Sequence, residues 1–199
     1  MRLRNGTVVL KLSRFVTGRQ RDEVVEKFLN WAFKKLSKVG KQDFVNPVYK
    51  DSAALCTHNK VYNLQISFSE NLLKIRAKLE HDAILNICFP QKFFDLNIDA
   101  KTRFLAEKLI MEDQKNYLNS TIEELNQLYF CAQYKLCRFK RMNHRFGSLS
   151  SKGNINIAYR LLMAPREVFR YVCVHELAHL KEFNHSGKYW LIVTNYPKE

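Results

Sequence analysis

An HExxH motif constrains this chain more than any other feature of its sequence. The motif is His175-Glu176-Leu177-Ala178-His179, inside an otherwise apolar segment. Residues four apart on an α-helix lie about 40° apart around the axis and roughly 6 Å apart along it, so both imidazoles can reach one metal ion. Chance alone gives this motif in about one of a hundred chains of this composition. The sequence therefore predicts a helix that presents two metal ligands.

His185 is the candidate third ligand. It lies in the segment Asn184-His185-Ser186-Gly187, where Asn and Gly are residue types that end a helix and let the chain turn back. Zinc binds imidazole nitrogen, and a catalytic zinc site has three protein ligands with one position left open. We therefore expect one Zn²⁺ per chain, held by His175, His179 and His185.

Glu176 is the candidate catalytic residue. It lies about 100° around the helix from His175, close enough to contact a metal-bound water without having to ligate the metal. As general base it would take the proton of the attacking water and return it to the leaving amine, while zinc lowers the pKa of that water. The sequence thus predicts a zinc-dependent peptidase. Candidates for oxyanion or substrate contacts are Arg145, His144 and Tyr189, among which the sequence does not choose.

Charge and cysteine content indicate which partners and which cellular compartment the chain suits. Lys and Arg number 33 against 19 Asp and Glu, a net charge of +14, which attracts polyanions and makes nucleic acid a candidate partner through a basic surface. The five cysteines are an odd number without a CxxC pair, which argues against a disulfide framework. The chain also lacks an apolar run of the roughly 18 residues that span a bilayer and the apolar stretch of a signal peptide. We expect a cytoplasmic protein without membrane association.

Hydrophobic periodicity predicts an α+β chain. Alternation from Val61 to Phe89 predicts a small antiparallel meander, and Asn154–Tyr159 predicts a strand whose unpaired edge can bind an extended peptide. We expect either a β-rich part over residues 1–95 followed by a catalytic core over residues 96–199, or one continuous domain. Strands are also expected at Thr7–Ser13 and Tyr134–Lys140, and helices at Asp22–Leu36, Ala100–Leu118, Thr121–Ala132 (capped by Ser120) and from Pro165 to about Phe183.

The segment around the motif resembles a known family. Residues 171–186, followed by Tyr189-Trp190, closely resemble the signature of the YgjP-like metal-dependent hydrolases, small zincins related to the SprT and WLM families. Upstream, Arg145-Phe146-Gly147-Ser148 and the strand Asn154-Ile155-Asn156-Ile157 resemble that family's Arg-Trp-Gly-Ser-Cys block and its strand. Phe146 and Leu149 stand where the family has Trp and Cys. The resemblance is dense over residues 134–193 and looser before them.

This resemblance implies a fold and a set of roles. The implied fold is a zincin-like, minimal gluzincin-type catalytic core with an active-site helix and an edge strand, preceded by a β-rich antiparallel N-terminal part. The implied metal ligands are His175, His179 and His185, with Glu176 as general base and a peptide or protein as substrate. The family does not specify which substrate, and the sequence does not define the oligomeric state.

Two other interpretations stay open. The SprT and WLM groups act on proteins attached to nucleic acid, so a DNA-associated protease with the same chemistry is one. In its favour, the segment Lys135–Arg170 holds nine Lys or Arg and one acidic residue. The aromatics Phe139 and Phe146 within it and Tyr134 beside it suit either a nucleic-acid groove or a core. The other is a non-catalytic basic nucleic-acid-binding module with a structural metal. Against it stand the open three-histidine ligand set and Glu176.

Overall fold

The computed structural model describes residues 2–4, 7–9, 47–142 and 145–194. The chain divides into two units, one of residues 1–45 with 143–145 and one of residues 46–142 with 146–199. In the first unit, β1 (Arg2–Arg4) pairs antiparallel with β2 (Thr7–Val9). This pairing confirms a strand that begins at Thr7. The helix expected at Asp22–Leu36 lies outside the described residues.

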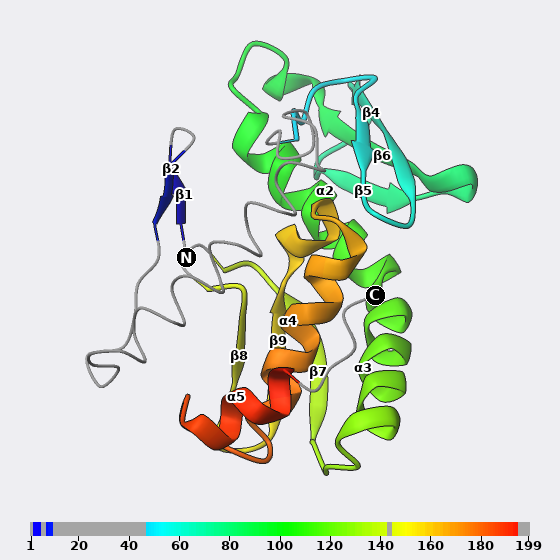
Figure 1. The fold of residues 1–199 in the computed structure, drawn as a ribbon. Helices are drawn as coiled ribbons and strands as arrows, with labels where there is room; N and C mark the ends of the chain where they lie inside the picture. Colours follow the sequence, from blue (N-terminus) through cyan, green and yellow to red (C-terminus); the bar gives the residue numbers. More distant parts are fainter. Residues whose placement is uncertain (1, 5–6, 10–46, 143–144, 195–199) are drawn as a thin grey trace. The chain divides into compact units, whose positions relative to one another are not determined.

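The second unit holds two sheets and four α-helices among its described residues, which confirms the α+β class (Figure 1). One sheet has the strand order β3-β4-β6-β5 and the other the order β7-β9-β8. The strands are β3 (Ala54–Cys56), β4 (Val61–Ser69), β5 (Arg76–Leu79), β6 (Ile84–Pro90), β7 (Leu136–Lys140), β8 (Gly147–Leu149) and β9 (Asn154–Ala158). The helices are α2 (Asp99–Asp113), α3 (Lys115–Tyr129), α4 (Arg166–Ala178) and α5 (Gly187–Thr194), with 3-10 turns η1 (His81–Ala83), η2 (Gln91–Phe93) and η3 (Tyr159–Met163).

The antiparallel meander expected over Val61–Phe89 is wrong. β6 lies between β4 and β5, parallel to β4 and antiparallel to β5. The physical reason is burial, because Leu85, Ile87 and Phe89 of β6 are fully buried and so favour a central strand with partners on both sides. β5 instead exposes Arg76 and Lys78, charged side chains that suit the edge of a sheet.

The prediction of an unpaired edge at Asn154–Tyr159 is also wrong. β9 is the central strand of its sheet, parallel to β7 and antiparallel to β8. Its residues from Ile155 to Ala158 are all buried, which again favours a position between two partners. Among the described strands, the edges of this sheet belong to β7 and to the short β8.

Helix boundaries differ from expectation at two places: where α2 meets α3, and at the end of α4, which stops at Ala178 and not near Phe183. α2 and α3 meet at Gln114, and not near residue 120. Ser120 lies inside α3, where its hydroxyl donates to the backbone oxygen of Tyr117 at 3.0 Å, so it is not an N-cap. Gln114 is almost fully buried and its side chain donates to the Tyr62 hydroxyl at 2.6 Å, which fixes the break between the helices.

α4 packs on the three-stranded sheet with α3 beside it (Figure 1). Its inner face, which includes Phe169, Cys173 and Leu177, is fully buried in a core shared with Leu125 of α3 and Ile155 of β9. A second hydrophobic cluster joins the four-stranded sheet to α2. This packing fixes the position of the helix that carries the HExxH motif. The expected division near residue 95 stays a prediction.

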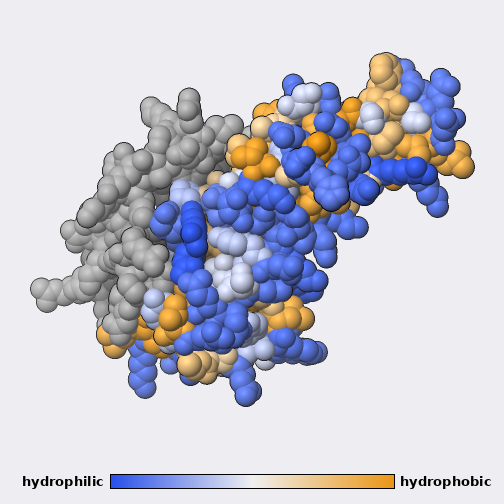
Figure 2. Space-filling model, turned by 90° about the vertical axis from the view of Figure 1, so that its right-hand side faces the viewer, coloured by the Kyte–Doolittle hydropathy of each residue, from blue (hydrophilic) through white to orange (hydrophobic). Residues whose placement is uncertain are grey.

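None of the helices in the described ranges is both long and apolar enough to cross a bilayer. On the face in Figure 2, hydrophilic side chains cover much of the surface and apolar ones gather in small groups. All five cysteines are free thiols; Cys137 and Cys173 are buried, whereas Cys56 and Cys131 are exposed.

Candidate metal centre

The end of α4 and the turn after it form the local frame of the site. His175 lies in the last turn of α4, and His179 is the residue at which the helix ends. Backbone bonds from Leu180 to Leu177 and from Lys181 to Ala178 then tighten the chain into a turn. This turn leads through His185 to α5, and α5 packs back against α4.

The structure brings the three predicted ligands together. One ring nitrogen from each of His175, His179 and His185 lies within 4.8 Å of the other two. The Nε2 atoms of His175 and His185 are 3.3 Å apart. Tetrahedral zinc with zinc–nitrogen distances of about 2.05 Å separates its ligand nitrogens by about 3.3 Å. The distance between the donors of His175 and His185 therefore fits a zinc ion.

The three histidines are also in the protonation state that binds a metal ion. Burial, together with the proximity of His179 and His185, lowers the pKa of His175 to about 3. Burial likewise lowers the pKa of His179 and of His185. All three imidazoles are thus held neutral, the form in which a ring nitrogen has a lone pair for a metal.

The outer ring nitrogens of the two helix histidines have hydrogen-bond partners. His179 Nδ1 lies 3.2 Å from the backbone oxygen of Glu182. Because a carbonyl only accepts, Nδ1 carries the hydrogen and Nε2 is left free to bind a metal. His175 Nδ1 lies 2.6 Å from the hydroxyl of Tyr189, a residue with no exposed surface.

Glu176 is confined against the edge strand. Only 4 % of its surface is exposed, and its side chain lies directly over the Cα atom of Gly147 in β8. A Cβ atom on Gly147 would come within 2.6 Å of both Cγ and Cδ of Glu176. The glycine in the Arg-Phe-Gly-Ser block therefore leaves room for this carboxylate, a contact that sequence reasoning did not identify.

The three residues predicted for oxyanion or substrate contacts have different surroundings. Tyr189 is fully buried beside the histidines, and burial together with the nearby Tyr171 and Glu176 raises its pKa. Arg145 is exposed and belongs to the first unit. His144 lies outside the described residues. The roles of all three stay predictions.

The aromatic residues considered for a nucleic-acid groove are mainly core residues. Phe139 packs against both hydrophobic clusters and lies 6.1 Å from Phe169, between ring centroids. Phe146 packs against the cluster around α4. Tyr134 donates its hydroxyl to Glu123 at 2.9 Å. This arrangement favours the core interpretation of the three aromatics.

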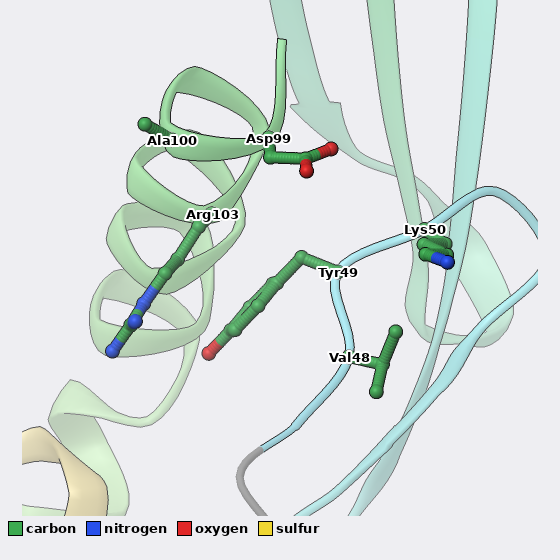
Figure 3. Close-up of a pocket in the computed structure, with 6 residues that line it drawn as sticks. All are labelled: Val48, Tyr49, Lys50, Asp99, Ala100 and Arg103. Carbon is green, nitrogen blue, oxygen red and sulfur yellow. The ribbon is translucent and has the colours of Figure 1, made fainter. Parts of the chain in front are cut away.

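A surface cavity of about 310 Å³ lies elsewhere in the second unit (Figure 3). Its lining includes Tyr49 and Arg103, whose polar groups both bond Oε1 of the fully buried Glu107. Tyr159 bonds the same oxygen at 2.5 Å, and Arg141 approaches the other at 2.6 Å. Glu107 is thereby compensated by two guanidinium groups and two phenols, which makes this network a structural one.

The second unit is a mixed α+β unit that has three clustered histidines and a confined glutamate on one helix and just after it. This is the arrangement expected of an HExxH metallopeptidase. The profile of the YgjP-like metallopeptidase domain matches residues 1–198, and the chain belongs to this family. No curated protein sequence matches it.

Two solved structures are similar to part of the chain. The metallopeptidase zymogen jannalysin of Methanocaldococcus jannaschii is 21% identical, covers 41% of this chain and 83% of its own, and has a TM-score of 0.37. The metallopeptidase zymogen abylysin of Pyrococcus abyssi is 25% identical, covers 41% of this chain and 82% of its own, and has a TM-score of 0.37.

Proposed function

We propose that this metallopeptidase is a zinc enzyme that hydrolyses peptide bonds with Glu176 as general base. The observation that carries the proposal is the convergence of three neutral histidine nitrogens within 4.8 Å, at the end of the helix that bears the buried Glu176 and in the turn after it. The three imidazoles would hold one Zn²⁺. When bound, the ion would act as a Lewis acid that lowers the pKa of water and polarises a carbonyl group.

The chain's own contribution to the reaction rests on Glu176. Its carboxylate accepts the proton of the attacking water at one Oε atom and delivers it to the nitrogen of the leaving amine. Because Gly147 and the surrounding core confine the side chain, the carboxylate is oriented before substrate binds. Such pre-orientation lowers the entropic part of the barrier. In fold terms, we propose a zincin-like core with α4 as active-site helix and β8 as edge strand.

The outer edge of β8 is the proposed binding surface for a peptide. Backbone bonds to β9 are made by Phe146, whose oxygen accepts from Ala158 at 2.7 Å, and by Ser150, which donates to Asn154 at 2.9 Å. In an antiparallel ladder the alternate residues, here Gly147 and Leu149, direct N–H and C=O away from the partner strand. An extended peptide can add to these groups as a further strand, beside the carboxylate of Glu176.

A non-catalytic module with a structural metal is less favoured. Structural zinc sites have four protein ligands, whereas the cluster in the described part of the chain has three. A structural metal site also requires no general base, whereas Glu176 is held against Gly147 beside the histidines. Free thiols at all five cysteines support a reducing, cytoplasmic setting, which we include in the proposal.

Metal content and hydrolysis test the proposal together. Wild type, His185→Ala and Glu176→Gln are purified without chelator, assayed for bound metals by mass spectrometry and incubated with fluorescein-labelled casein. We expect about one zinc per chain in wild type and Glu176→Gln, much less in His185→Ala, and hydrolysis by wild type alone. His81→Ala is the matched control, because His81 is exposed in η1 and outside the cluster. Wild type that binds no zinc, or Glu176→Gln that cleaves casein at the wild-type rate, would overturn the proposal.

A further inference from the structure

The side chain of Tyr189 contacts all three histidines of the proposed metal centre. It has no exposed surface. Its ring lies nearly parallel to that of His179, at 4.7 Å between centroids and 28° between planes. It meets the rings of His185 and His175 edge-on at 4.7 Å and 5.3 Å. Tyr189 is therefore the residue best placed to orient the cluster as a unit.

The hydroxyl of Tyr189 has two partners on a single residue. It lies 2.6 Å from Nδ1 of His175 and 3.2 Å from the backbone oxygen of His175. A phenol has one proton to donate, and a carbonyl oxygen can only accept. The phenol therefore donates to the carbonyl, and the short contact to the ring then requires that Nδ1 carries a hydrogen and donates it to the phenol oxygen.

This arrangement determines the other nitrogen of the ring. A neutral imidazole carries one N–H, so a hydrogen on Nδ1 leaves Nε2 with a free lone pair. Nε2 of His175 is the atom that faces the cluster, 3.3 Å from Nε2 of His185. We propose that Tyr189 is a positioning residue whose hydroxyl links Nδ1 of His175 to the backbone oxygen of the same residue and so holds His175 in the tautomer that binds metal.

His175 and His179 thus both carry their hydrogen on Nδ1, but different hydrogen bonds hold it there. His179 donates directly to the backbone oxygen of Glu182, whereas His175 reaches a carbonyl through a phenol. The start of α5 sets the position of this phenol, since the backbone N–H of Tyr189 lies 3.3 Å from the Ser186 hydroxyl that accepts from it. Folding of α5 is therefore part of the assembly of the site. The inference rests on the proposed function, because it concerns the same metal.

Tyr189→Phe keeps the ring contacts and removes only the hydroxyl. Loss of a partner on the outer nitrogen of a ligating histidine commonly weakens metal binding about 10- to 100-fold, and we expect a decrease of that size in zinc affinity, measured by competition with a chromophoric chelator. Tyr62→Phe is the matched control. Tyr62, in β4 of the four-stranded sheet, is also fully buried, and its hydroxyl bonds Asp113 and Gln114 at the end of α2, so the zinc affinity of Tyr62→Phe should equal that of wild type.

A second measurement is made on wild type and so does not depend on whether a variant folds. In metal-free wild type at neutral pH, the ¹⁵N shifts of the imidazoles report which nitrogen is protonated, and we expect Nδ1–H for His175. A hydrogen on Nε2 would overturn the inference, as would a zinc affinity in Tyr189→Phe equal to that of wild type. Either result leaves the proposed function standing if wild type binds zinc. Wild type that binds no zinc refutes the proposed function itself.

Discussion

Replacing Gly147 by alanine tests how closely the carboxylate of Glu176 is confined. The new Cβ atom would come within 2.6 Å of Cγ and Cδ of Glu176, whereas ordinary contacts begin at 3.4 Å. The carboxylate oxygen Oε1 of this residue would be closer still, so the glutamate side chain must move by about 1 Å or change its rotamer. None of the three histidines is among the atoms that the new methyl group would meet most closely.

The expected consequence is a loss of rate without a loss of metal. A misplacement of about 1 Å in a reacting group can cost about 10²-fold in rate, and we expect kcat on a casein probe to fall by that order in Gly147→Ala. Crowding of a packed site costs about 1–3 kcal/mol in stability, which urea unfolding measures. Zinc content should stay at the wild-type level.

Gly187→Ala is the matched control for this experiment. A Cβ atom at Gly187 meets nothing within 4 Å, and alanine is favoured over glycine in a helix by about 0.5–1 kcal/mol. This variant should keep wild-type activity and stability or gain slightly in stability. If Gly147→Ala were as active as wild type, the idea that Gly147 confines the general base would be refuted.

Three other predictions concern stability and metal. Phe169→Ala removes a fully buried ring of α4 and should lower the free energy of unfolding by about 3–5 kcal/mol in urea titrations; a loss below 1 kcal/mol would contradict the packing described for α4. The hydrogen bond from Arg170 lowers the pKa of Glu124, so this pair stabilises the fold above the ordinary carboxyl pKa and loses its effect as the pH falls through the lowered pKa. Glu124→Gln should therefore cost at most about 1 kcal/mol at pH 7, since Glu124 is largely exposed, and flatten the acid side of the stability curve; an unchanged curve would argue against the ion pair. Zinc added at one hundred times its dissociation constant should stabilise the metal-free protein by about 2.7 kcal/mol, visible as a higher Tm that a His185→Ala variant lacks.

The sequence predicts the helix of the site well because its geometry is local. Histidines four apart share a helix face whatever the rest of the fold does, and the Asn and Gly on either side of His185 are residue types that predict the end of that helix nearby. The buried face of α4 in the structure includes Phe169, Cys173 and Leu177, which are spaced four apart. The cluster could thus be predicted from one short stretch of the chain.

The pairing of strands could not be predicted in the same way. Alternation in Tyr62–Phe68 and Ile75–Leu79 shows which side chains share a face, but it does not show which strand lies next to which. The parallel pairing of β4 with β6 depends on the burial of β6 in the whole unit. The contact between Gly147 and Glu176 also depends on tertiary packing, since these residues lie on different elements and glycine carries no side chain to signal a partner.

The position of Tyr189 has a consequence for how the site forms during folding. The three histidines and Tyr189 belong to α4, the turn after it and α5, so the metal-binding half of the site involves only short loop closures, which have a small entropic cost. Confinement of Glu176 by Gly147 requires the sheet and is a contact of longer sequence separation, which forms more slowly. We therefore expect the chain to acquire the capacity to hold a metal before it acquires an aligned base, so that a partly folded molecule binds the ion without hydrolysing peptides.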